Sequence, residues 1–303
     1  MEKIKKLKKK FKEFNLDGYL IPKNDEFFNE YVPLHQDDLQ YITNFSGSYG
    51  LALILKRGNF LFVDGRYTIQ ASIESGRNFK VLPHPLLIKK NSLNLKNKRI
   101  GFDPKLFNEN FINKFSNKLG IECMAVNSNL VKLIKEKKNY IKKKKSFYVL
   151  DDKITGESWF NKVKNLKKNF FKNEIDIMLV TSSENIAWLL NIRGHDTDYS
   201  PLPNCYLIID KKMRIFLFCD LDKVDSKFEK KLSFIHILKI NELENFLQRI
   251  KNKNFLIDDL TCSIFYKNII EKYNYISQKI DPVYFLKSQK NKLELKNTKK
   301  IHE

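Results

Sequence analysis

Apolar residues recur along this chain at two spacings, one typical of helices and one typical of strands. Residues 2–14 place apolar side chains at intervals of three and four on a lysine-rich background, which predicts an amphipathic helix packed on a sheet. Asp17-Gly18 indicates the end of that helix. Residues 19–21 then predict a strand, which Pro22 closes.

A β-hairpin is predicted next, because two apolar runs, 49–55 and 60–63, lie on either side of the turn-forming residues 56–59. Since a hairpin joins antiparallel strands, we expect a mixed sheet. Further strands are predicted at 79–82, 99–102 and 121–126, with one helix ending near Gly76 and another over 105–119.

The second half of the chain repeats this order. Residues 41–47 read Y-I-T-N-F-S-G and residues 188–194 read W-L-L-N-I-R-G, so that Asn44 matches Asn191 and the final glycines align. The repeated elements are helices at 156–171 and 263–273 and strands at 175–180, 205–209, 214–219, 234–238, 254–257 and 276–280. A duplicated α/β domain of roughly 140 residues explains the whole order.

Residues 132–145 are rich in lysine and have few apolar positions, which makes them the candidate boundary between the two copies. We therefore predict domain I at 1–135 and domain II at 146–284. Residues 285–303 predict the beginning of another lysine-rich helix. Because the second copy is complete before it, we interpret this helix as the start of a third, missing unit.

The net charge of +21 is typical of many nucleic-acid-binding proteins. However, lysine supplies most of the basic residues, whereas base and phosphate recognition favours arginine. No helix-turn-helix, RNP or zinc-finger pattern occurs either. We therefore expect no specific nucleic-acid partner.

The cysteines and the apolar runs of the sequence indicate the cellular compartment in which the protein is expected. The four cysteines form no C-x-x-C pair and predict neither disulfides nor a zinc site. No apolar run approaches the ~18 residues that a membrane span needs, and no secretory h-region follows the basic N-terminus. These observations favour a cytoplasmic protein without a membrane partner.

Familiar catalytic motifs are missing from both halves. The five histidines are scattered, and neither H-E-x-x-H, G-x-S-x-G nor a phosphate-binding loop is present. The acidic residues at the ends of predicted strands, Asp64, Asp103 and Asp220, stand singly and are typical of turns and helix caps.

One cluster, Arg193 with the His195-Asp196 pair, could take part in chemistry. The aspartate could hold the imidazole tautomer, and the arginine could bind a carboxylate. The alternative interpretation is that Arg193 and Asp196 brace the loop that follows the repeated turn.

Several longer segments are found in one order across both halves. In the first half they are D-G-Y-L-I-P (17–22), E-Y-V-P (30–33), I-T-N-F-S-G-S (42–48), F-V-D-G-R-Y (62–67) and Q-A (70–71); in the second they are 150–158, 186–194 and 201–206. Together they resemble the N-terminal region of Xaa-Pro aminopeptidase (aminopeptidase P) in its three-domain form. The resemblance implies an α/β fold of two tandem creatinase N-terminal-like domains, each a mixed β-sheet flanked by helices.

The same resemblance implies an activity for the full-length family. Its members are cytosolic metallopeptidases that remove the N-terminal residue preceding proline, and they are commonly dimers. They are expected to use two Mn²⁺ or similar ions, held by two Asp, one His and two Glu in a third, pita-bread domain. Residues 281–303 resemble only the connection into that domain and its first helix, so the catalytic domain is absent from this sequence.

No catalytic residue, metal ligand or cofactor can therefore be assigned to this chain, and we expect it to be inactive alone, as a fragment. Its expected role is to contribute to oligomer assembly and substrate access. Its expected partners are a second copy or the missing catalytic domain, with peptide substrate bound only in the full-length form. The candidate contacts with substrate or partner are Phe45, Arg66, Arg193, His195 and Asp196. The alternative is a stand-alone peptide- or protein-binding scaffold without peptidase activity.

Overall fold

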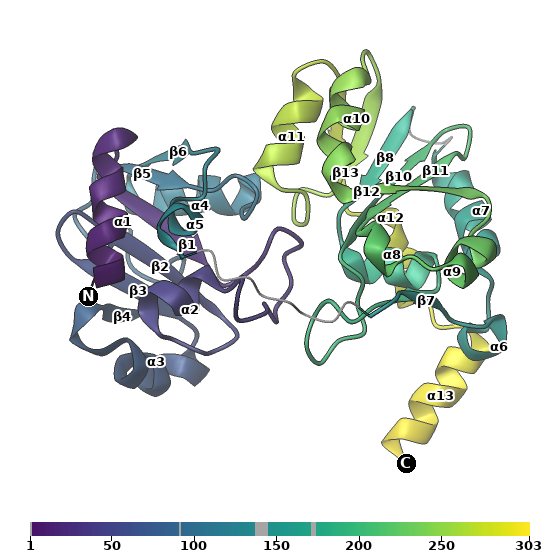
Figure 1. The fold of residues 1–303 in the computed structure, drawn as a ribbon, viewed down its shortest axis with the longest axis horizontal. Helices are drawn as coiled ribbons and strands as arrows, with labels where there is room; N and C mark the ends of the chain where they lie inside the picture. Colours follow the sequence, from purple (N-terminus) through teal and green to yellow (C-terminus); the bar gives the residue numbers. More distant parts are fainter. Residues whose placement is uncertain (1, 91, 137–144, 171–173) are drawn as a thin grey trace. The chain divides into compact units, whose positions relative to one another are not determined.

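The computed structural model describes residues 2–90, 92–136, 145–170 and 174–303 of the chain. The chain forms two compact units, residues 1–141 (unit 1) and 142–303 (unit 2), and each unit has its own six-stranded sheet (Figure 1). Of the lysine-rich stretch predicted to join the domains, residues 137–144 lie outside the described residues.

The sheet of unit 1 is mixed, as the sequence predicts. Its strands are β1 (Gly18–Pro22), β2 (Gly50–Leu55), β3 (Asn59–Val63), β4 (Lys80–Pro83), β5 (Arg99–Phe102) and β6 (Glu122–Ala125). Their spatial order is β4-β3-β2-β1-β5-β6. The β1–β2 and β2–β3 pairs are antiparallel, and the other three pairs are parallel. Because β1 and β2 are buried along their whole length, the sheet must be covered on both faces.

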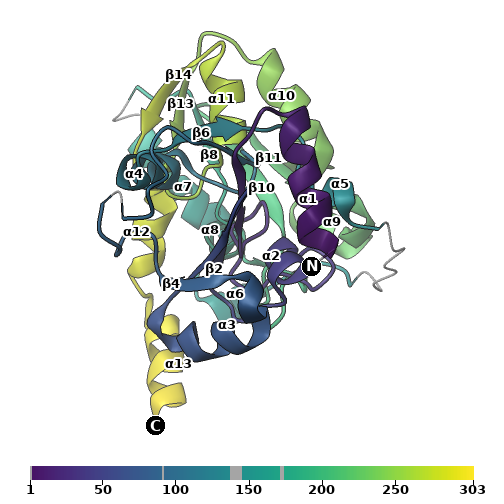
Figure 2. The ribbon, with the colours of Figure 1, turned by 90° about the vertical axis from the view of Figure 1, so that its left-hand side faces the viewer.

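Helices cover both faces of this sheet. The helices of unit 1 are α1 (Glu2–Glu13), α2 (Asp38–Thr43), α3 (Thr68–Ser75), α4 (Glu109–Leu119) and α5 (Leu130–Ile134), with 3₁₀ turns at Gly65–Tyr67 and Gly76–Asn78. On one face, α1, α2 and α5 bury Leu7, Leu39 and Leu130 in a shared core. On the other, α4 places Phe115 edge-on against Phe62 of β3. Figure 2 shows α1, α2 and α5 on one side of the strands and α4 on the other.

Unit 2 has the same strand order. Its strands are β8 (Ile177–Val180), β10 (Cys205–Asp210), β11 (Ile215–Cys219), β12 (Ile235–Lys239), β13 (Asn254–Ile257) and β14 (Tyr275–Gln278), arranged β12-β11-β10-β8-β13-β14. Here too the two pairs that involve β10 are antiparallel and the other three are parallel. The identical pairing confirms the predicted internal repeat. A separate two-stranded ladder joins β7 (Tyr148–Val149) to β9 (Ile192–Arg193).

The helices of unit 2 correspond to those of unit 1, with additions. They are α6 (Asp152–Thr155), α7 (Trp159–Phe170), α8 (Ser183–Leu189), α9 (Ser226–Lys231), α10 (Leu243–Arg249), α11 (Ile264–Glu271), α12 (Pro282–Ser288) and α13 (Lys292–His302), with 3₁₀ turns at Leu221–Lys223 and Ile240–Glu242. Residues of α7, α8, α9 and α12 share one core with the sheet. On the opposite face, Tyr266 of α11 contacts Tyr206 and Phe246 of α10 contacts Phe218.

The repeated N-x-x-G segment follows a short helix in each unit, whereas the sequence predicts only a turn there. Asn44 follows α2 with φ 64°, and Asn191 lies just beyond α8 with φ 55°. Asparagine tolerates this left-handed conformation better than other side chains do. Gly47 is needed for a different reason, because a Cβ there would lie 2.3 Å from the Phe45 ring.

Three helix boundaries differ from the predicted ones. Helix α4 begins at 109 rather than 105, because the Asn108 side chain caps it by accepting from the Phe111 N–H. Helix α7 begins at 159 rather than 156, because Gly156, with φ 75°, ends the short helix α6. The helix predicted over 285–303 is two helices, since Asn291 starts α13 with a capping box that includes Glu294. The predicted start of a further unit, at 285, falls inside α12.

Candidate functional site

The predicted cluster at residues 193–196 begins with Arg193, the last residue of β9, and continues into the loop before β10. The Asp196 carboxylate accepts from Lys223 Nζ at 2.6 Å through one oxygen and from the Asn204 N–H at 2.7 Å through the other. Asp196 N also donates to the Leu202 carbonyl at 3.2 Å. Both carboxylate oxygens thus bind partners that hold the loop in place, rather than orienting the His195 imidazole.

The Arg193 side chain is bound to backbone carbonyls, whereas the His195 side chain is exposed to solvent. The Arg193 guanidinium donates through Nη1 to the carbonyls of Ala187 (3.0 Å) and Ile192 (2.8 Å), and burial lowers its pKa. His195 is exposed, with its ring 5.8 Å from that of Tyr148. The arginine therefore ties α8 to β9, while the imidazole faces solvent beside a tyrosine.

The two predicted residues of unit 1 both lie against the Tyr67 ring. Phe45 is fully buried and packs edge-on against the Tyr67 ring, with centroids 5.6 Å apart. Arg66 is exposed, pairs with Asp64 at 2.6 Å, and has its guanidinium carbon 5.3 Å from the centre of the same ring. The hydrogen bond from Arg66 lowers the Asp64 pKa. Phe45 thus belongs to the core, whereas Arg66 lies on the surface.

A buried lysine in unit 2 was not identified from the sequence. Lys162 of α7 is 2 % exposed and donates to the Trp188 carbonyl at 2.9 Å and to Asn191 Oδ1 at 2.7 Å. Its Nζ also lies 4.1 Å from the Trp188 ring centre. Burial lowers the Lys162 pKa to about 8. In a lysine-rich chain, only its place on the apolar face of α7 distinguishes it.

The same network fixes the beginning of α13. Asn191 Nδ2 donates to Thr155 Oγ1 (3.1 Å), and Asn291 Nδ2 donates to the Thr155 carbonyl (2.8 Å). Trp188 Nε1 donates to Glu294 Oε1 at 3.1 Å. The first turn of α13 is therefore held by groups from α6 and α8, and Figure 1 shows the rest of α13 projecting away from unit 2.

The described part of the chain contains neither a metal-binding cluster nor a helix that could span a membrane. Its residues contain no group of three or more His, Cys, Asp or Glu side chains arranged to hold a metal ion. The four cysteines are free, and burial raises the pKa of each thiol. Among the helices of the described residues, none is long and apolar enough to cross a bilayer.

Comparison with known proteins defines the class to which the two units belong. Residues 3–137 and residues 141–294 match two models of the creatinase/prolidase N-terminal domain. A crystal structure of X-prolyl aminopeptidase from Caenorhabditis elegans, described as a cytosolic enzyme with a di-nuclear active site, superimposes with a TM-score of 0.85 at 25% identity. That match covers 97% of this chain and 52% of the other.

Curated relatives agree. Xaa-Pro aminopeptidase 1 of Dictyostelium discoideum is 27% identical over 321 residues, covering 99% of this chain and 51% of the relative. Xaa-Pro aminopeptidase 2 of Homo sapiens is 27% identical over 220 residues, covering 69% and 33%. The chain belongs to the creatinase/prolidase N-terminal domain family, and the resemblance to the N-terminal domains of Xaa-Pro aminopeptidases is confirmed. The chain spans about half the length of the Dictyostelium relative, which it matches over nearly its whole length.

Proposed function

We propose that this chain supplies the two non-catalytic N-terminal domains of a cytoplasmic Xaa-Pro aminopeptidase-like metallopeptidase. The observation that carries the proposal is the end-to-end match, at a TM-score of 0.85, to about half of an X-prolyl aminopeptidase. In the whole protein, a further domain would hold two divalent ions such as Mn²⁺ and cleave the bond before proline. This chain would contribute to oligomer assembly and to substrate access.

Helices α12 and α13 are the proposed connection to that domain. Tyr284 and Phe285 of α12 are each 55% exposed, and Ile301 of α13 is 80% exposed. None of the residues of α13 is buried, yet its first turn is fastened to α6 and α8. A fixed helix with uncovered apolar side chains supports packing of a further domain along it.

Peptidase assays of the chain alone test this proposal. Incubated with Mn²⁺ and a tripeptide that has proline at the second position, the purified chain should release no N-terminal residue beyond a control with chelator. Metal-dependent release by this chain would overturn the assignment as non-catalytic.

Mass spectrometry of the protein isolated from its source cells provides a second test. A species about twice the mass of this chain, carrying its peptides, supports the proposal. A species of this length alone favours a stand-alone scaffold.

The proposed contacts are tested through assembly. Arg66 and His195 are exposed and each can be replaced without disturbing a core, so R66A and H195A should leave the melting temperature unchanged. If either side chain contacts a partner, sedimentation of the whole protein should show weakened self-association, or the KM for peptide should rise. Unchanged assembly and unchanged kinetics in both variants would remove these two residues from the proposed surface.

A further inference from the structure

Unit 1 has a crevice at the carboxyl ends of β1 and β5, which lie side by side and parallel. After β1 the chain passes through α2 to β2, on one side of β1, and after β5 it passes through α4 to β6, on the other side. Connections that leave neighbouring strands in opposite directions open a crevice outside the strand ends, where open α/β sheets place their ligands.

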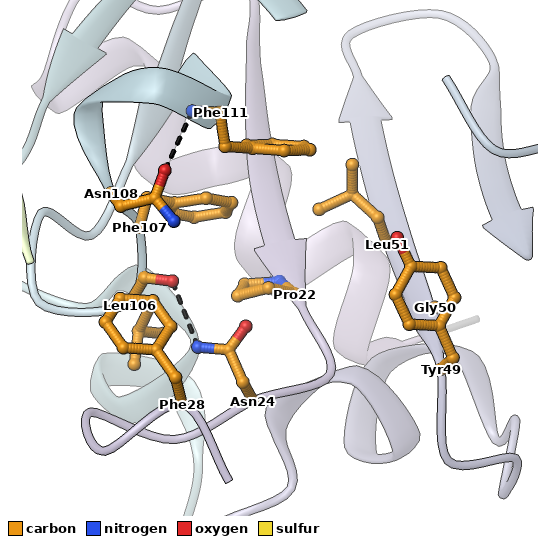
Figure 3. Close-up of a pocket in the computed structure, with 10 residues that line it drawn as sticks. All are labelled: Pro22, Asn24, Phe28, Tyr49, Gly50, Leu51, Leu106, Phe107, Asn108 and Phe111. Carbon is orange, nitrogen blue, oxygen red and sulfur yellow. Dashed lines mark hydrogen bonds between the residues drawn. The ribbon is translucent and has the colours of Figure 1, made fainter. Parts of the chain in front are cut away.

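A cavity of about 160 Å³ lies in this crevice. It is lined mostly by apolar and aromatic side chains, with two asparagines: Pro22, Asn24, Phe28, Tyr49, Gly50, Leu51, Leu106, Phe107, Asn108 and Phe111. Figure 3 shows Phe107 and Phe111 on one side, Leu51 and Tyr49 facing them, and Pro22 and Asn24 between. A cavity of about 150 Å³ is large enough for one benzene ring.

The walls of the cavity are braced from outside. Phe111 stacks between Phe107 and Phe115, with centroid separations of 5.8 Å and 5.7 Å. The His84 ring contacts both Tyr49 (5.8 Å) and Phe111 (6.5 Å), so it holds the two opposing walls apart. Burial lowers the His84 pKa. None of the ten residues that line the cavity is a charged residue.

One polar group is positioned toward the ligand space. Asn24 Nδ2 donates to the carbonyls of Leu106 (3.0 Å) and Asp25 (2.8 Å), which fixes the amide plane. With the nitrogen held there, Oδ1 points toward Pro22 and the interior of the cavity (Figure 3). An amide oxygen in such a site accepts a hydrogen bond from an N–H or O–H group of a ligand.

The corresponding place in unit 2 is filled by the chain itself. Asn108 caps α4 and Ser263 caps α11 in the same way, which aligns Phe111 with Tyr266 and Leu106 with Thr261. Leu51 and Tyr206 are the second residues of β2 and β10. In unit 2, the Tyr206 ring contacts Tyr266 at 5.0 Å.

A hydrogen bond closes the remaining side of the unit 2 crevice. Thr181 Oγ1, just after β8, donates to Thr261 Oγ1 at 2.9 Å. Tyr206 is 1% exposed, so its side chain is buried in unit 2. Since the topology is the same in both units, the cavity of unit 1 results from its side chains and not from the fold.

We propose that the cavity of unit 1 binds one uncharged aromatic ring whose edge carries a hydrogen-bond donor, as in phenol or indole. Tyr49, Leu51, Phe107 and Phe111 enclose the ring, as the Tyr206 side chain occupies the crevice of unit 2. Asn24 Oδ1 accepts from the donor. The ring belongs either to a small molecule or to a tyrosine or tryptophan side chain of a peptide.

Saturation-transfer NMR with phenol tests the site, using the full chain. We expect phenol to bind with a dissociation constant on the order of 1 mM, because few atoms are enclosed. Leu51→Tyr, which copies unit 2, should fill the cavity and weaken binding at least tenfold. Leu133→Tyr, at an exposed position of α5, is the matched control and should bind like the wild type. Absence of binding to the wild type, or equal binding to L51Y that retains its circular dichroism, overturns the proposal.

A second variant and two further ligands make the test independent of L51Y folding. Anisole, which lacks the donor, should bind several-fold more weakly than phenol, and Asn24→Leu should abolish that preference. Equal binding of phenol and anisole to the wild type would exclude the role of Asn24. N-acetyl-tyrosine amide separates the two sources of the ring. Competition with phenol supports a peptide side chain, and binding of phenol without competition supports a small molecule.

Discussion

The two units have the same strand order and the same pairing, yet they differ at the polar positions where helices meet. In unit 1, Asn129 at the N-terminus of α5 donates to Asp38 of α2, with Nδ2 and Oδ2 3.0 Å apart. In unit 2, Asn185 of α8 donates to Asp281 at the N-terminus of α12, at 2.6 Å. The acid and the amide have exchanged helices.

This difference shows which positions the fold constrains. The apolar residues of both sheets need only be apolar and of suitable volume, so they diverge freely while the topology stays the same. A buried carboxylate must have a partner, so its change is matched by a change on the facing helix. The crevices differ in side-chain volume and in polarity: unit 2 has Tyr206 where unit 1 has Leu51, and it pairs Thr261, in place of Leu106, with Thr181.

The largest expected effect separates the two left-handed asparagines. Asn191→Ala should lower the free energy of unfolding by about 3 kcal/mol, from backbone strain and from the hydrogen bonds that Lys162 and Thr155 each lose. Asn44 is exposed, so Asn44→Ala should cost only about 1 kcal/mol. Urea denaturation measures both. Asn→Gly at each position relieves the strain, and a large loss should remain only for N191G. Equal losses for the two alanine variants would contradict this.

A pH-dependent effect is expected from the exchanged acid. Burial raises the pKa of Asp281 to about 6, so the folded state binds this proton more tightly than the unfolded state does. The contribution of Asp281 to stability is therefore present below pH 4 and is lost as the pH rises through 6. Relative to Asp281→Asn, the wild type should lose at most about 3 kcal/mol between pH 4 and pH 7.

Denaturation at several pH values checks the expectation for Asp281. The N-cap bond from Val283 N–H can still be made by the asparagine in D281N, so the difference between the two proteins isolates the titration. Asp38→Asn is the matched variant in unit 1, where burial also raises the carboxyl pKa. A wild-type minus D281N difference that does not vary from pH 4 to pH 7 would show that Asp281 is not perturbed.

The smallest effect concerns the fastening of α13. Trp188→Phe removes the donor to Glu294 and should cost about 1 kcal/mol. Amide hydrogen exchange should report it locally, because the first turn of α13 loses one of its ties while the sheet of unit 2 keeps its protection. Unit 1 serves as the internal control. Loss of protection throughout unit 2 would show that Trp188 supports the whole core instead.

The strands of both sheets could be predicted from the sequence, because they are short apolar runs and because the second half of the chain repeats their order. It was insufficient for α2 and α8, since helices of six or seven residues show barely two turns of periodicity. The cavity was not predictable because Leu51 and Tyr206 are equally apolar in such a pattern, and only their volumes decide whether space remains. The burial of Lys162 was not predictable either, because nothing in a lysine-rich sequence sets this lysine apart from the exposed ones.

The sequence brings the predicted contact residues Arg193, His195 and Asp196 together on one short segment. It does not predict the pairing of Asp196 with Lys223. That ion pair joins residues 27 apart, and their proximity depends on how the β10–β11 hairpin folds back. Local patterns carry no such information. The sequence likewise does not tell Phe45 from Arg66 in burial. The structure places Phe45 in the core and Arg66 on the surface.

The exchanged acid and amide also bear on how a tandem repeat avoids assembling incorrectly. Two similar sheets in one chain could each accept the terminal helix of the other while the chain folds. If α12 docked on unit 1, Asp281 would face Asp38, and two buried carboxylates would repel each other. If α5 docked on unit 2, Asn129 would face Asn185 with no charge between them. Each buried carboxylate thus has its amide partner only when α5 and α12 pack on their own units.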